Sequence, residues 1–350
     1  MDKADILAQV TEATGQGQPI DIQGGNTKCF FGRSAVGEPL DISAYAGIIE
    51  HDPAELVVTT CAGTRVTDLQ NALAEHRQML PFSPPCFGPA GTVGGMVAAG
   101  LSGPSRPWSG SVRDYVLGSE IVNGRGEHLK LGGRVMKNVA GYDASRLMTG
   151  AMGTLGVILE VSLKVLPAPE VMTTRVFECD ESAAIEQAAE YAQTALPLAA
   201  CCYVNGRLHV RLAGSRQGVD AGLELIGGDS LDDETGFWDS VRDLTHPFFD
   251  SERPLWRVSL PPATPPLAVP GGFVDWGGAQ RWYAAQREEI EPLMQQVQQA
   301  GGYVSQFRGG DRTADVNARL DPVIWRLHKQ VKQAFDPAGI LNPGRLYAGI

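Results

Sequence analysis

The sequence predicts a protein of mixed helices and strands, folded in two or three domains. A chain of 350 residues is longer than one ordinary hydrophobic core supports. Strand and helix patterns alternate through the first third of the chain, which is typical of a layered α/β region. After Pro169 the pattern restarts in the order strand, helix, strand, strand, helix, which resembles a ferredoxin-like module.

Apolar spacing and turn residues locate the elements of the first half of the chain. The hairpin is the strongest of them, because Asn123-Gly124 lies between two runs rich in β-forming residues. Helices are predicted where apolar residues recur every three or four positions, and strands where short apolar runs end at glycine or proline. The predicted elements are helices over 2–14, 64–77 and 143–149, strands over 19–23, 55–61 and 156–166, and a hairpin over 115–131.

The second half of the chain follows the same signals. In its last helix Ile324, Leu327, Val331 and Phe335 recur at helical spacing, which predicts one apolar stripe. The proline-rich segment 261–270 is predicted to be a linker or a surface loop. The predicted elements are strand 173–178, helix 181–194, a hairpin over 199–213 that turns at Asn205-Gly206, and helices over 217–226, 288–300 and 322–335.

Charge and cysteine usage exclude several classes of function. The formal net charge of −11 argues against nucleic acid as a partner and disfavours attachment to anionic lipid, since both need clustered Lys and Arg. None of the six cysteines forms a C-x-x-C pair, so the sequence predicts neither a zinc ribbon nor an iron–sulfur cluster. The N-terminus lacks the apolar core of a signal peptide, and no segment has the length of a membrane span, which predicts a cytoplasmic protein.

Two glycine-rich segments have the composition of phosphate-binding loops. Residues 23–28 directly follow a predicted strand, so their successive amides can form an anion-binding nest; an ordinary turn is the alternative. Residues 88–100 contain a predicted helix start near Thr92, whose amides would face a pyrophosphate; tight packing of small residues is the alternative. The second segment is not G-x-G-x-x-G, which argues against a Rossmann site for NAD.

Two further segments complete the set of candidate ligand loops. In residues 109–114, Asp114 either caps a turn or binds a ribose hydroxyl. In residues 138–157, Asp143 fits a helix N-cap, and Gly150, Gly153 and Gly156 at three-residue spacing allow the backbone to lie against a flat ring. Each segment is weak evidence when taken alone, whereas their order and spacing together are specific.

Together these segments resemble the vanillyl-alcohol oxidase (PCMH) type of FAD-binding domain. The motifs are QGGNTK, GPAGTVGGMVAAG, GSVRDYVLGSEIVNGRGE, NVAGYDASRLMTGAMGTLGVILEVSLKVLP and DPAGILNPGR. The resemblance implies an α+β fold: an FAD-binding domain over 1–170 with subdomains of about 1–80 and 81–170, a ferredoxin-like cap over 171–320, and a C-terminal helix and tail over 321–350 that packs on the FAD-binding domain. Within this superfamily the chain resembles the FAD-binding E subunits of bacterial glycolate oxidases, through GLSGPSRPWSGSVRDYVLG, GRVMKNVAGYDASRLM, PLWRVSLP and VDWGGAQRW.

Carried over by position, the resemblance implies which residues contact FAD. The first loop would wrap the pyrophosphate and the second would line the other phosphate and the ribitol. The third would approach the flavin and ribose, the fourth would follow the ring and adenine, and the C-terminal tail would return to the flavin. The implied residues are Gln23, Gly24, Gly25, Asn26, Thr27, Lys28, Gly88, Pro89, Thr92, Gly94, Gly95, Ser109, Gly110, Ser111, Asp114, Asn138, Gly141, Gly150, Gly153, Thr154, Gly156, Val157, Asn342 and Arg345.

The chain departs from some relatives at positions that matter for chemistry. The first loop has no histidine, and Cys86 does not match the offset of cysteine-tethered relatives, so FAD is expected to be non-covalent. Related hydroxy-acid dehydrogenases carry a late His-rich metal motif that is absent here, so no metal site is expected. Candidates for a substrate-binding cation are Arg308, Arg312 and Arg345, and candidates for a base are His246 and His328. The catalytic residue is left unassigned.

The departures favour an accessory role within a glycolate oxidase complex that oxidises glycolate to glyoxylate and passes electrons to a non-oxygen acceptor. The implied partners are a catalytic FAD subunit and an iron–sulfur subunit, with association to the inner face of a membrane through the complex as a further option. One alternative is a self-sufficient FAD-dependent 2-hydroxy-acid dehydrogenase. Another is a non-enzymatic interaction subunit with a decayed FAD site.

Overall fold

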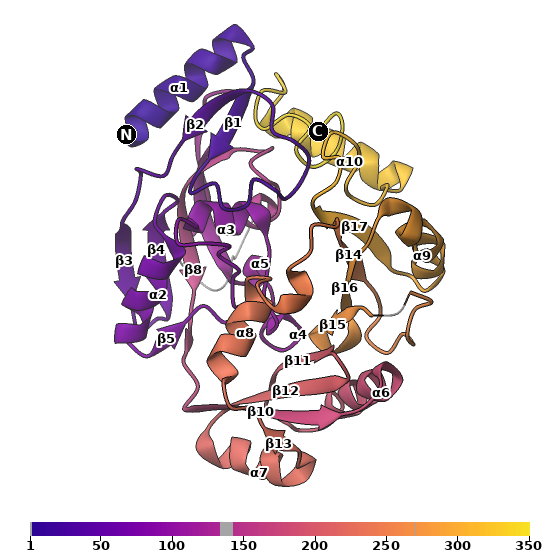
Figure 1. Ribbon diagram of the computed structural model, residues 1–350. Helices are drawn as coiled ribbons and strands as arrows, with labels where there is room; N and C mark the ends of the chain where they lie inside the picture. The colour runs from indigo at the N-terminus through magenta and orange to yellow at the C-terminus, as the bar shows by residue number, and fades with distance from the viewer. Residues whose placement is uncertain (1, 134–142, 270) are drawn as a thin grey trace.

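The computed structural model describes residues 2–133, 143–269 and 271–350. Two sheets organise the chain. A five-stranded sheet belongs to the N-terminal half, and an eight-stranded sheet belongs to the C-terminal half. Figure 1 shows the two sheets side by side, with the C-terminal helix beside the N-terminal elements. Within the described ranges, no helix is both long enough and apolar enough to cross a membrane.

The five-stranded sheet is antiparallel throughout, in the order β3-β4-β8-β6-β7. Its central strand β8 is buried along nearly its whole length, and it pairs with β4 on one side and β6 on the other. The hairpin predicted over 115–131 is confirmed as the β6–β7 pair. The strands are β3 Ile48–Asp52, β4 Val57–Cys61, β6 Val116–Val122, β7 His128–Gly132 and β8 Val157–Lys164.

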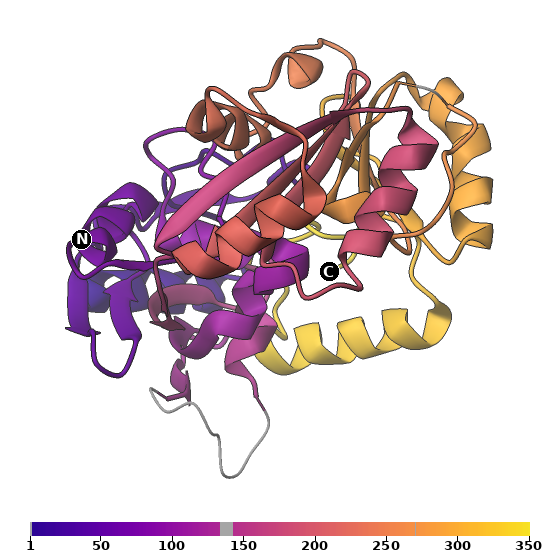
Figure 2. The ribbon, with the colours of Figure 1, turned by 90° about the horizontal axis from the view of Figure 1, so that it is seen from below.

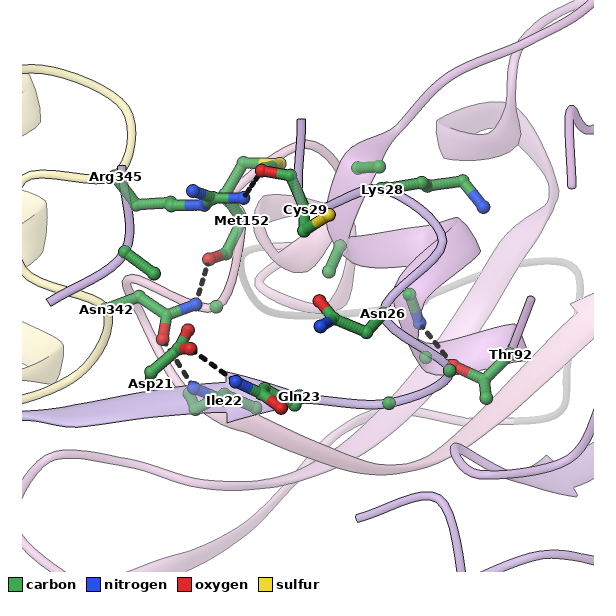
Figure 3. Close-up of a pocket in the computed structure, with 18 of the residues that line it drawn as sticks. Asp21, Ile22, Gln23, Asn26, Lys28, Cys29, Thr92, Met152, Asn342 and Arg345 are labelled. Carbon is green, nitrogen blue, oxygen red and sulfur yellow. Dashed lines mark hydrogen bonds between the residues drawn. The ribbon is translucent and has the colours of Figure 1, made fainter. Parts of the chain in front are cut away.

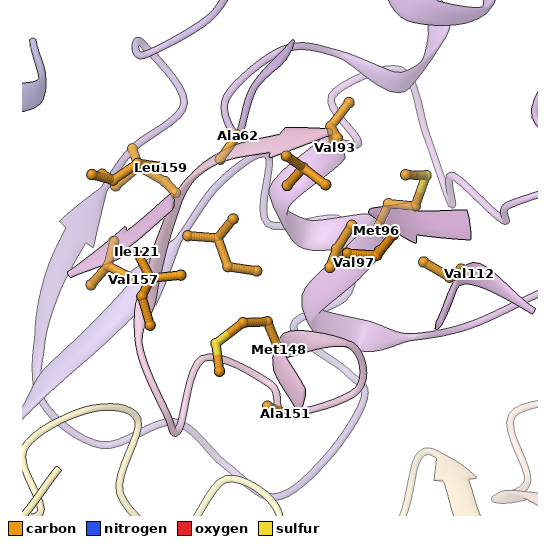
Figure 4. Packing of buried hydrophobic residues seen from close by; sticks show 14 of the residues in the cluster. Ala62, Val93, Met96, Val97, Val112, Ile121, Met148, Ala151, Val157 and Leu159 are labelled. Atoms are coloured by element: carbon orange, nitrogen blue, oxygen red, sulfur yellow. The ribbon is translucent and has the colours of Figure 1, made fainter. Parts of the chain in front are cut away.

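Helices α2 (Val66–Glu75) and α3 (Val93–Ala99) belong to the same core. Figure 4 shows Val93, Met96 and Val97 of α3 facing apolar side chains of the sheet. All three side chains are buried. Burial of this kind is the main stabilising contribution to the domain.

The N-terminal segment adds smaller elements around this core. The predicted helix and strand are confirmed as α1 (Lys3–Gln16) and β1 (Ile20–Gln23), and β1 pairs in parallel with β2 (Glu38–Asp41). A second small pair joins β5 (Gln78–Met79) to β9 (Leu166–Pro167). Strand β1 also bridges the far end of the chain through Ile20 and Leu341, so the C-terminal tail lies against the first strand.

The first half of the eight-stranded sheet has the predicted order of strand, helix, strand, strand, helix. Its strand order β13-β10-β12-β11 places the fourth strand beside the first, as in a ferredoxin-like module. The turn of the β11–β12 hairpin lies at Asn205 and Gly206, both with positive φ. The elements are β10 Val171–Glu178, α6 Glu181–Tyr191, β11 Leu198–Val204, β12 Arg207–Gly214, α7 Arg216–Ile226 and β13 Asp229–Ser230.

The second half continues the sheet in the order β15-β16-β14-β17. The two halves meet where Tyr203 of β11 pairs with Val274 of β15. Helices α4 (Arg106–Ser109) and α5 (Val112–Tyr115) are single turns of the first half of the chain. The elements of the second half are α8 Glu234–Arg242, β14 Leu255–Ser259, β15 Phe273–Asp275, β16 Gln280–Ala284, α9 Arg287–Gln299, β17 Tyr303–Arg308 and α10 Pro322–Phe335.

Helix α10 is fixed to the N-terminal core by its second half. The Lys332 ammonium donates to the Thr154 and Leu341 carbonyls at 2.8 and 2.9 Å and pairs with Asp336 at 2.6 Å. The predicted apolar stripe is therefore only partly buried: Ile324 and Leu327 are 42% and 48% exposed. Figure 2 shows α10 along the lower edge of the molecule.

One predicted helix is wrong in type. The segment predicted over 143–149 contains a single 3-10 turn, η1, at Ser145–Met148. Its four residues are followed by Thr149 in an extended conformation and by Gly150 with φ of 78°, and neither conformation continues a helix. Asp143 does not cap an α-helix, and its carboxylate instead accepts a hydrogen bond from the Ser145 hydroxyl at 2.8 Å.

Candidate functional site

A cavity of about 370 Å³ lies between the first strand, helix α3 and the C-terminal tail. This volume lies in the range of small-molecule sites. Figure 3 shows Asn342 and Arg345 on one side of the cavity, and Lys28 and Thr92 on the other. Segments that lie more than 300 residues apart in the chain thus line the same cavity.

The first glycine loop contributes unpaired backbone amides. In the part of the chain that the structure describes, the N–H groups of Gly25, Asn26, Thr27 and Lys28 donate to no protein group. These residues line the cavity, so their amides are accessible to a ligand, and the anion-binding nest stays a prediction of the sequence. Gly25 has a packing role as well, since a Cβ there would lie 1.4 Å from the carbonyl oxygen of Ala90.

The second glycine loop differs in how its amides are used. As predicted, a helix begins after Thr92, whose hydroxyl accepts from the Gly95 amide at 3.2 Å. The Val93 amide donates to Thr64 and the Gly94 amide donates to Ala62, at 2.8 and 2.7 Å. The expectation that this helix start presents free amides to a pyrophosphate is therefore wrong for residues 93–95, because two backbone carbonyls and the Thr92 hydroxyl already accept from them.

The C-terminal tail closes the cavity through one amide side chain. Asn342 accepts from the Ile22 amide at 2.7 Å and donates to the Met152 carbonyl at 2.6 Å. Both ends of the Asn342 side chain are therefore bonded, and Asn342 joins strand β1 to the loop before β8. Gly153 has φ of 75°, and a Cβ there would lie 2.6 Å from the Asn342 amide nitrogen. The close approach explains the glycine at this position.

Three cationic side chains line the cavity without a carboxylate partner among the described residues. Arg345 donates to the Cys29 carbonyl at 2.9 Å and also to the Arg33 carbonyl. Arg312 donates to the carbonyls of Gly32 and Gln306, both at 2.8 Å, and burial lowers its pKa to about 10. Burial also lowers the pKa of Lys28 and of Arg345, although nearby acidic groups partly oppose it.

Comparison with known proteins identifies the family. A family model described as an FAD binding domain matches residues 1–132, and one described as the C-terminal domain of FAD linked oxidases matches residues 281–346. The chain is 44% identical to the glycolate oxidase subunit GlcE of Escherichia coli (strain K12), over 98% of this chain and 97% of that protein. The chain belongs to the GlcE family. It is an FAD-linked oxidoreductase subunit, and FAD is its cofactor.

More distant relatives share only part of the sequence. The chain is 35% identical to the glycolate oxidase subunit GlcD of Bacillus subtilis (strain 168), over 36% of this chain and 27% of that one. It is 36% identical to a D-lactate dehydrogenase of Anaerostipes hadrus, over 43% and 32% respectively. A solved alkyldihydroxyacetonephosphate synthase superposes with a TM-score of 0.68 at 15% identity, covering 98% of this chain and 74% of that chain, which shows the shared fold.

The cavity of this GlcE-family chain fits FAD chemically. A pyrophosphate carries negative charge; the free amides of the first loop are complementary donors, and three cationic side chains in the lining make the cavity positive. Ile22, Ile42 and Ile158 give the same cavity apolar walls, which suit the flat rings of a dinucleotide. When bound, FAD supplies the capacity to accept electrons, and the protein supplies its binding and orientation.

Part of the predicted site is gathered at the cavity. The lining residues that the sequence predicts come from all three walls and include both residues of the C-terminal tail. They are Gln23, Gly24, Gly25, Asn26, Thr27, Lys28, Thr92, Gly94, Gly95, Gly153, Gly156, Asn342 and Arg345.

The remaining predicted residues lie elsewhere or outside the described ranges. The Asp114 carboxylate caps a turn, accepting from the Ser111 amide and hydroxyl at 2.8 Å each, and the amide hydrogen bond lowers its pKa. Thr154 is buried and bonded to the Ala151 carbonyl, and Val157 packs in the core. Gly88, Pro89, Ser109, Gly110, Ser111 and Gly150 do not belong to the cavity lining. Asn138 and Gly141 lie outside the described residues.

Sequence reasoning missed lining residues of two kinds. Apolar ones such as Ile42 and Ile158 have the pattern of ordinary core strands, so nothing in the sequence marks them as ligand contacts. Arg312 is anticipated only as a substrate cation, and its place at the FAD cavity depends on a contact between distant segments. The unanticipated residues are Asp21, Ile22, Cys29, Ser34, Ala35, Ile42, Ala98, Ala99, Met152 and Ile158.

Groups that would serve a metal or a substrate base do not gather at this cavity. Within the described ranges, no three His, Cys, Asp or Glu side chains cluster in a way that could hold a metal ion. His246 accepts from the Phe248 amide at 3.2 Å, and His328 bonds the Ile324 carbonyl at 2.9 Å on the exposed side of α10. Arg308 donates to the Phe249 carbonyl. These side chains therefore have structural partners away from the cavity.

Proposed function

We propose that this chain is the FAD-binding accessory subunit of a complex that oxidises glycolate to glyoxylate and passes electrons to a non-oxygen acceptor. The observation that carries the proposal is the cavity with free amides in its first loop and cations in its lining, in a chain similar to E. coli GlcE over nearly its full length. A decayed site is disfavoured, because buried cations without an anionic ligand cost free energy.

The accessory role is supported by what surrounds the cavity. A hydroxy acid needs a base for its hydroxyl proton and a cation for its carboxylate. The cavity lining contains no histidine among the described residues, and its arginines already donate to backbone carbonyls. A catalytic flavoprotein subunit would therefore oxidise the substrate, and an iron–sulfur subunit would receive the electrons.

Non-covalent FAD is part of the proposal. The first loop carries no histidine, and the Cys86 thiol is buried with Sγ 3.8 Å from the Pro84 carbonyl. Burial raises the pKa of Cys86, so the thiol is held neutral rather than as a nucleophilic thiolate. Denaturation with acid should release all of the flavin into the supernatant, whereas a yellow precipitate would mean a covalent bond.

The proposed division of the chain is 1–170 for FAD binding, 171–320 for the cap and 321–350 for the C-terminal helix and tail. It is supported by the two sheets, because the five-stranded sheet ends at Lys164 and the eight-stranded one begins at Val171. The FAD contacts proposed are those predicted residues that line the cavity. A cytoplasmic location, with association to the inner membrane face through the complex, belongs to the same proposal.

The test compares the full complex with the isolated chain. The isolated, FAD-loaded chain should show flavin absorption that anaerobic glycolate leaves unchanged, while the assembled complex should reduce a dye with glycolate. Removal of this chain from the complex should abolish that activity or the assembly. Bleaching of the isolated chain by glycolate would identify a self-sufficient dehydrogenase, and full activity of a complex that lacks the chain would overturn the proposal.

A further inference from the structure

Lys28 belongs to the cavity lining, and its partly buried side chain ends beside Cys86 and Phe87. Among the described residues, Lys28 donates one hydrogen bond, to the Cys86 carbonyl at 3.4 Å, and its Nζ lies 5.6 Å from the centre of the Phe87 ring. An ammonium has three donors, and one long hydrogen bond leaves most of this capacity unused. The Lys28 ammonium is therefore partly desolvated, which lowers its pKa, and it is only weakly bonded.

The carboxylate nearest to Lys28 is already committed to other groups. Asp243 accepts from the amides of Cys86 and Phe87 at 2.7 and 3.3 Å, and its other oxygen accepts from Arg242 at 2.6 Å. The Cys86 thiol also offers no negative charge, since burial raises its pKa. The charge of Lys28 is thus not neutralised by a close partner within the described residues.

Lys28 differs in this respect from the two arginines of the same cavity. Arg312 and Arg345 each donate two or more hydrogen bonds to backbone carbonyls, which fix their guanidinium groups against the chain. Their main effect is to hold loops together. Lys28 remains available to a ligand.

The surroundings of Lys28 indicate which part of a ligand it meets. Phe87 packs against Phe30 at 5.1 Å between ring centres, and against Phe307 of β17 at 6.4 Å. Phe307 in turn packs against Trp282 of β16 at 4.9 Å. The ammonium therefore lies beside an aromatic cluster that joins the first loop to the eight-stranded sheet, whereas the free amides that suit a pyrophosphate belong to the backbone of the loop.

We propose that Lys28 is a positioning residue that stabilises the negative charge gained by the ring system of FAD on reduction. Uptake of two electrons and one proton leaves the ring with one additional negative charge. In the complex, the two electrons would originate from the substrate that the catalytic subunit oxidises, which releases two protons to solvent, and the ring would take its one proton from solvent. A cation beside the ring favours the reduced form and raises the midpoint potential of the cofactor. The inference rests on the proposed function only in requiring bound FAD.

The decisive measurement is the ratio of the dissociation constants of oxidised and reduced FAD. Apoprotein of the full chain is titrated anaerobically with FAD and with dithionite-reduced FAD, for the wild type, Lys28→Met and Lys28→Arg. We expect Lys28→Met to weaken binding of reduced FAD about tenfold more than binding of oxidised FAD, which corresponds to a potential lower by about 30 mV. Lys28→Arg, which keeps the charge, should retain most of the wild-type ratio.

A matched control separates a local effect from a change in net charge. Lys130 has a side chain that is 72% exposed on the edge strand β7, and Lys130→Met removes the same charge. This variant should leave the ratio unchanged. If Lys28→Met does not fold, as judged by circular dichroism, Lys28→Gln keeps polar donors without the charge and should give the same shift as the methionine.

The outcomes distinguish two anionic parts of the same cofactor. Equal weakening of both redox forms would place Lys28 against the pyrophosphate and overturn the proposal, as would an unchanged ratio. Because the titration contains no glycolate, its result does not depend on the identity of the substrate. Failure of the wild-type chain to bind either form of FAD would instead count against the proposed function and overturn the inference with it.

Discussion

The two glycine-rich loops that pack against each other beside the cavity look alike in sequence but differ in what their amides do. Among the described residues, the N–H groups of residues 25–28 have no partner, while the amides of residues 93–95 all donate to neighbouring protein oxygens. The difference arises because α3 begins against the loop after β4, which supplies the Ala62 and Thr64 carbonyls. In the described part of the chain, no carbonyl accepts from the amides of residues 25–28.

This contrast shows that glycine content alone does not identify a phosphate-binding loop. In the second loop glycine is needed for close packing: a Cβ at Gly94 would lie 2.7 Å from the Ala62 Cβ. In the first loop Gly25 allows contact with Ala90 and also leaves an amide free. Ligand binding and tight packing use the same residue type, and only the partners of each amide separate them.

The largest effect is expected where the two loops touch. A Cβ at position 25 would overlap the Ala90 carbonyl oxygen at 1.4 Å, so Gly25→Ala must push the loops apart. We expect a loss of about 3 kcal/mol or more in the free energy of unfolding, together with loss of FAD binding. Urea denaturation and flavin absorbance measure the two quantities.

The matched control for this substitution is Gly15→Ala in α1. Nothing lies within 4 Å of a Cβ at Gly15, so alanine should be neutral or stabilising by about 0.5–1 kcal/mol. Wild-type stability and FAD binding in Gly25→Ala would mean that the loops can separate at no cost in free energy. The close contact of Gly25 with Ala90 would then not be needed for the fold or for FAD binding.

A smaller effect is expected at Asn342, which supports the first loop from the tail. Asn342→Ala leaves the Ile22 amide and the Met152 carbonyl without a partner, which should cost about 2 kcal/mol of stability. FAD affinity should fall as well, because β1 leads directly into the first loop. Asn342→Asp keeps the acceptor for Ile22 and loses only the donor to Met152.

The aspartate variant makes this prediction specific. Its carboxylate would face the Met152 carbonyl, so it should destabilise the protein while retaining the β1 contact. Calorimetry and FAD titration of both variants should therefore show a larger loss of affinity for alanine than for aspartate. The reverse order would mean that the hydrogen bond from Asn342 to the Met152 carbonyl positions the cofactor.

The sequence predicted most of the fold because local signals agreed with tertiary packing. The Asn205-Gly206 turn set the β11–β12 hairpin, and the Thr92 cap set the start of α3. Burial was predicted less well, because it depends on which elements pack together in the folded chain. Ile324 and Leu327 continue the stripe of Val331 and Phe335, yet only the second half of α10 has a surface to cover, since Lys332 anchors that half.

The candidate site was predictable to a similar extent and for a related reason. The first loop and the tail were found through their motifs, and the structure gathers them at one cavity. The carbonyls that accept from the amides of α3 belong to another segment of the chain. Among the described residues Lys28 has no carboxylate partner, and the nearby Asp243 is bonded to the Cys86 amide. No local pattern encodes such contacts.

At Thr92 we expect an effect on stability without an equal effect on the cofactor. Thr92→Val removes the hydroxyl that accepts from Gly95 and should cost about 1 kcal/mol, as for other helix N-caps. Thr92→Ser keeps the cap and serves as its control. If Thr92→Val instead left stability intact and weakened FAD binding strongly, the second loop would bind the cofactor through this hydroxyl.

The smallest effect is expected at Asp114, where the sequence left open a cap or a ribose contact. Its carboxylate bonds the Ser111 amide and hydroxyl in a four-residue helix, outside the cavity lining. Asp114→Ala should therefore cost about 0.5 kcal/mol and leave the dissociation constant of FAD unchanged. Asp114→Asn, which keeps an acceptor, should lie between alanine and the wild type in thermal stability. A loss of FAD affinity with unchanged stability would restore the ribose role, and would mean that the third glycine segment moves toward the cavity when the cofactor binds.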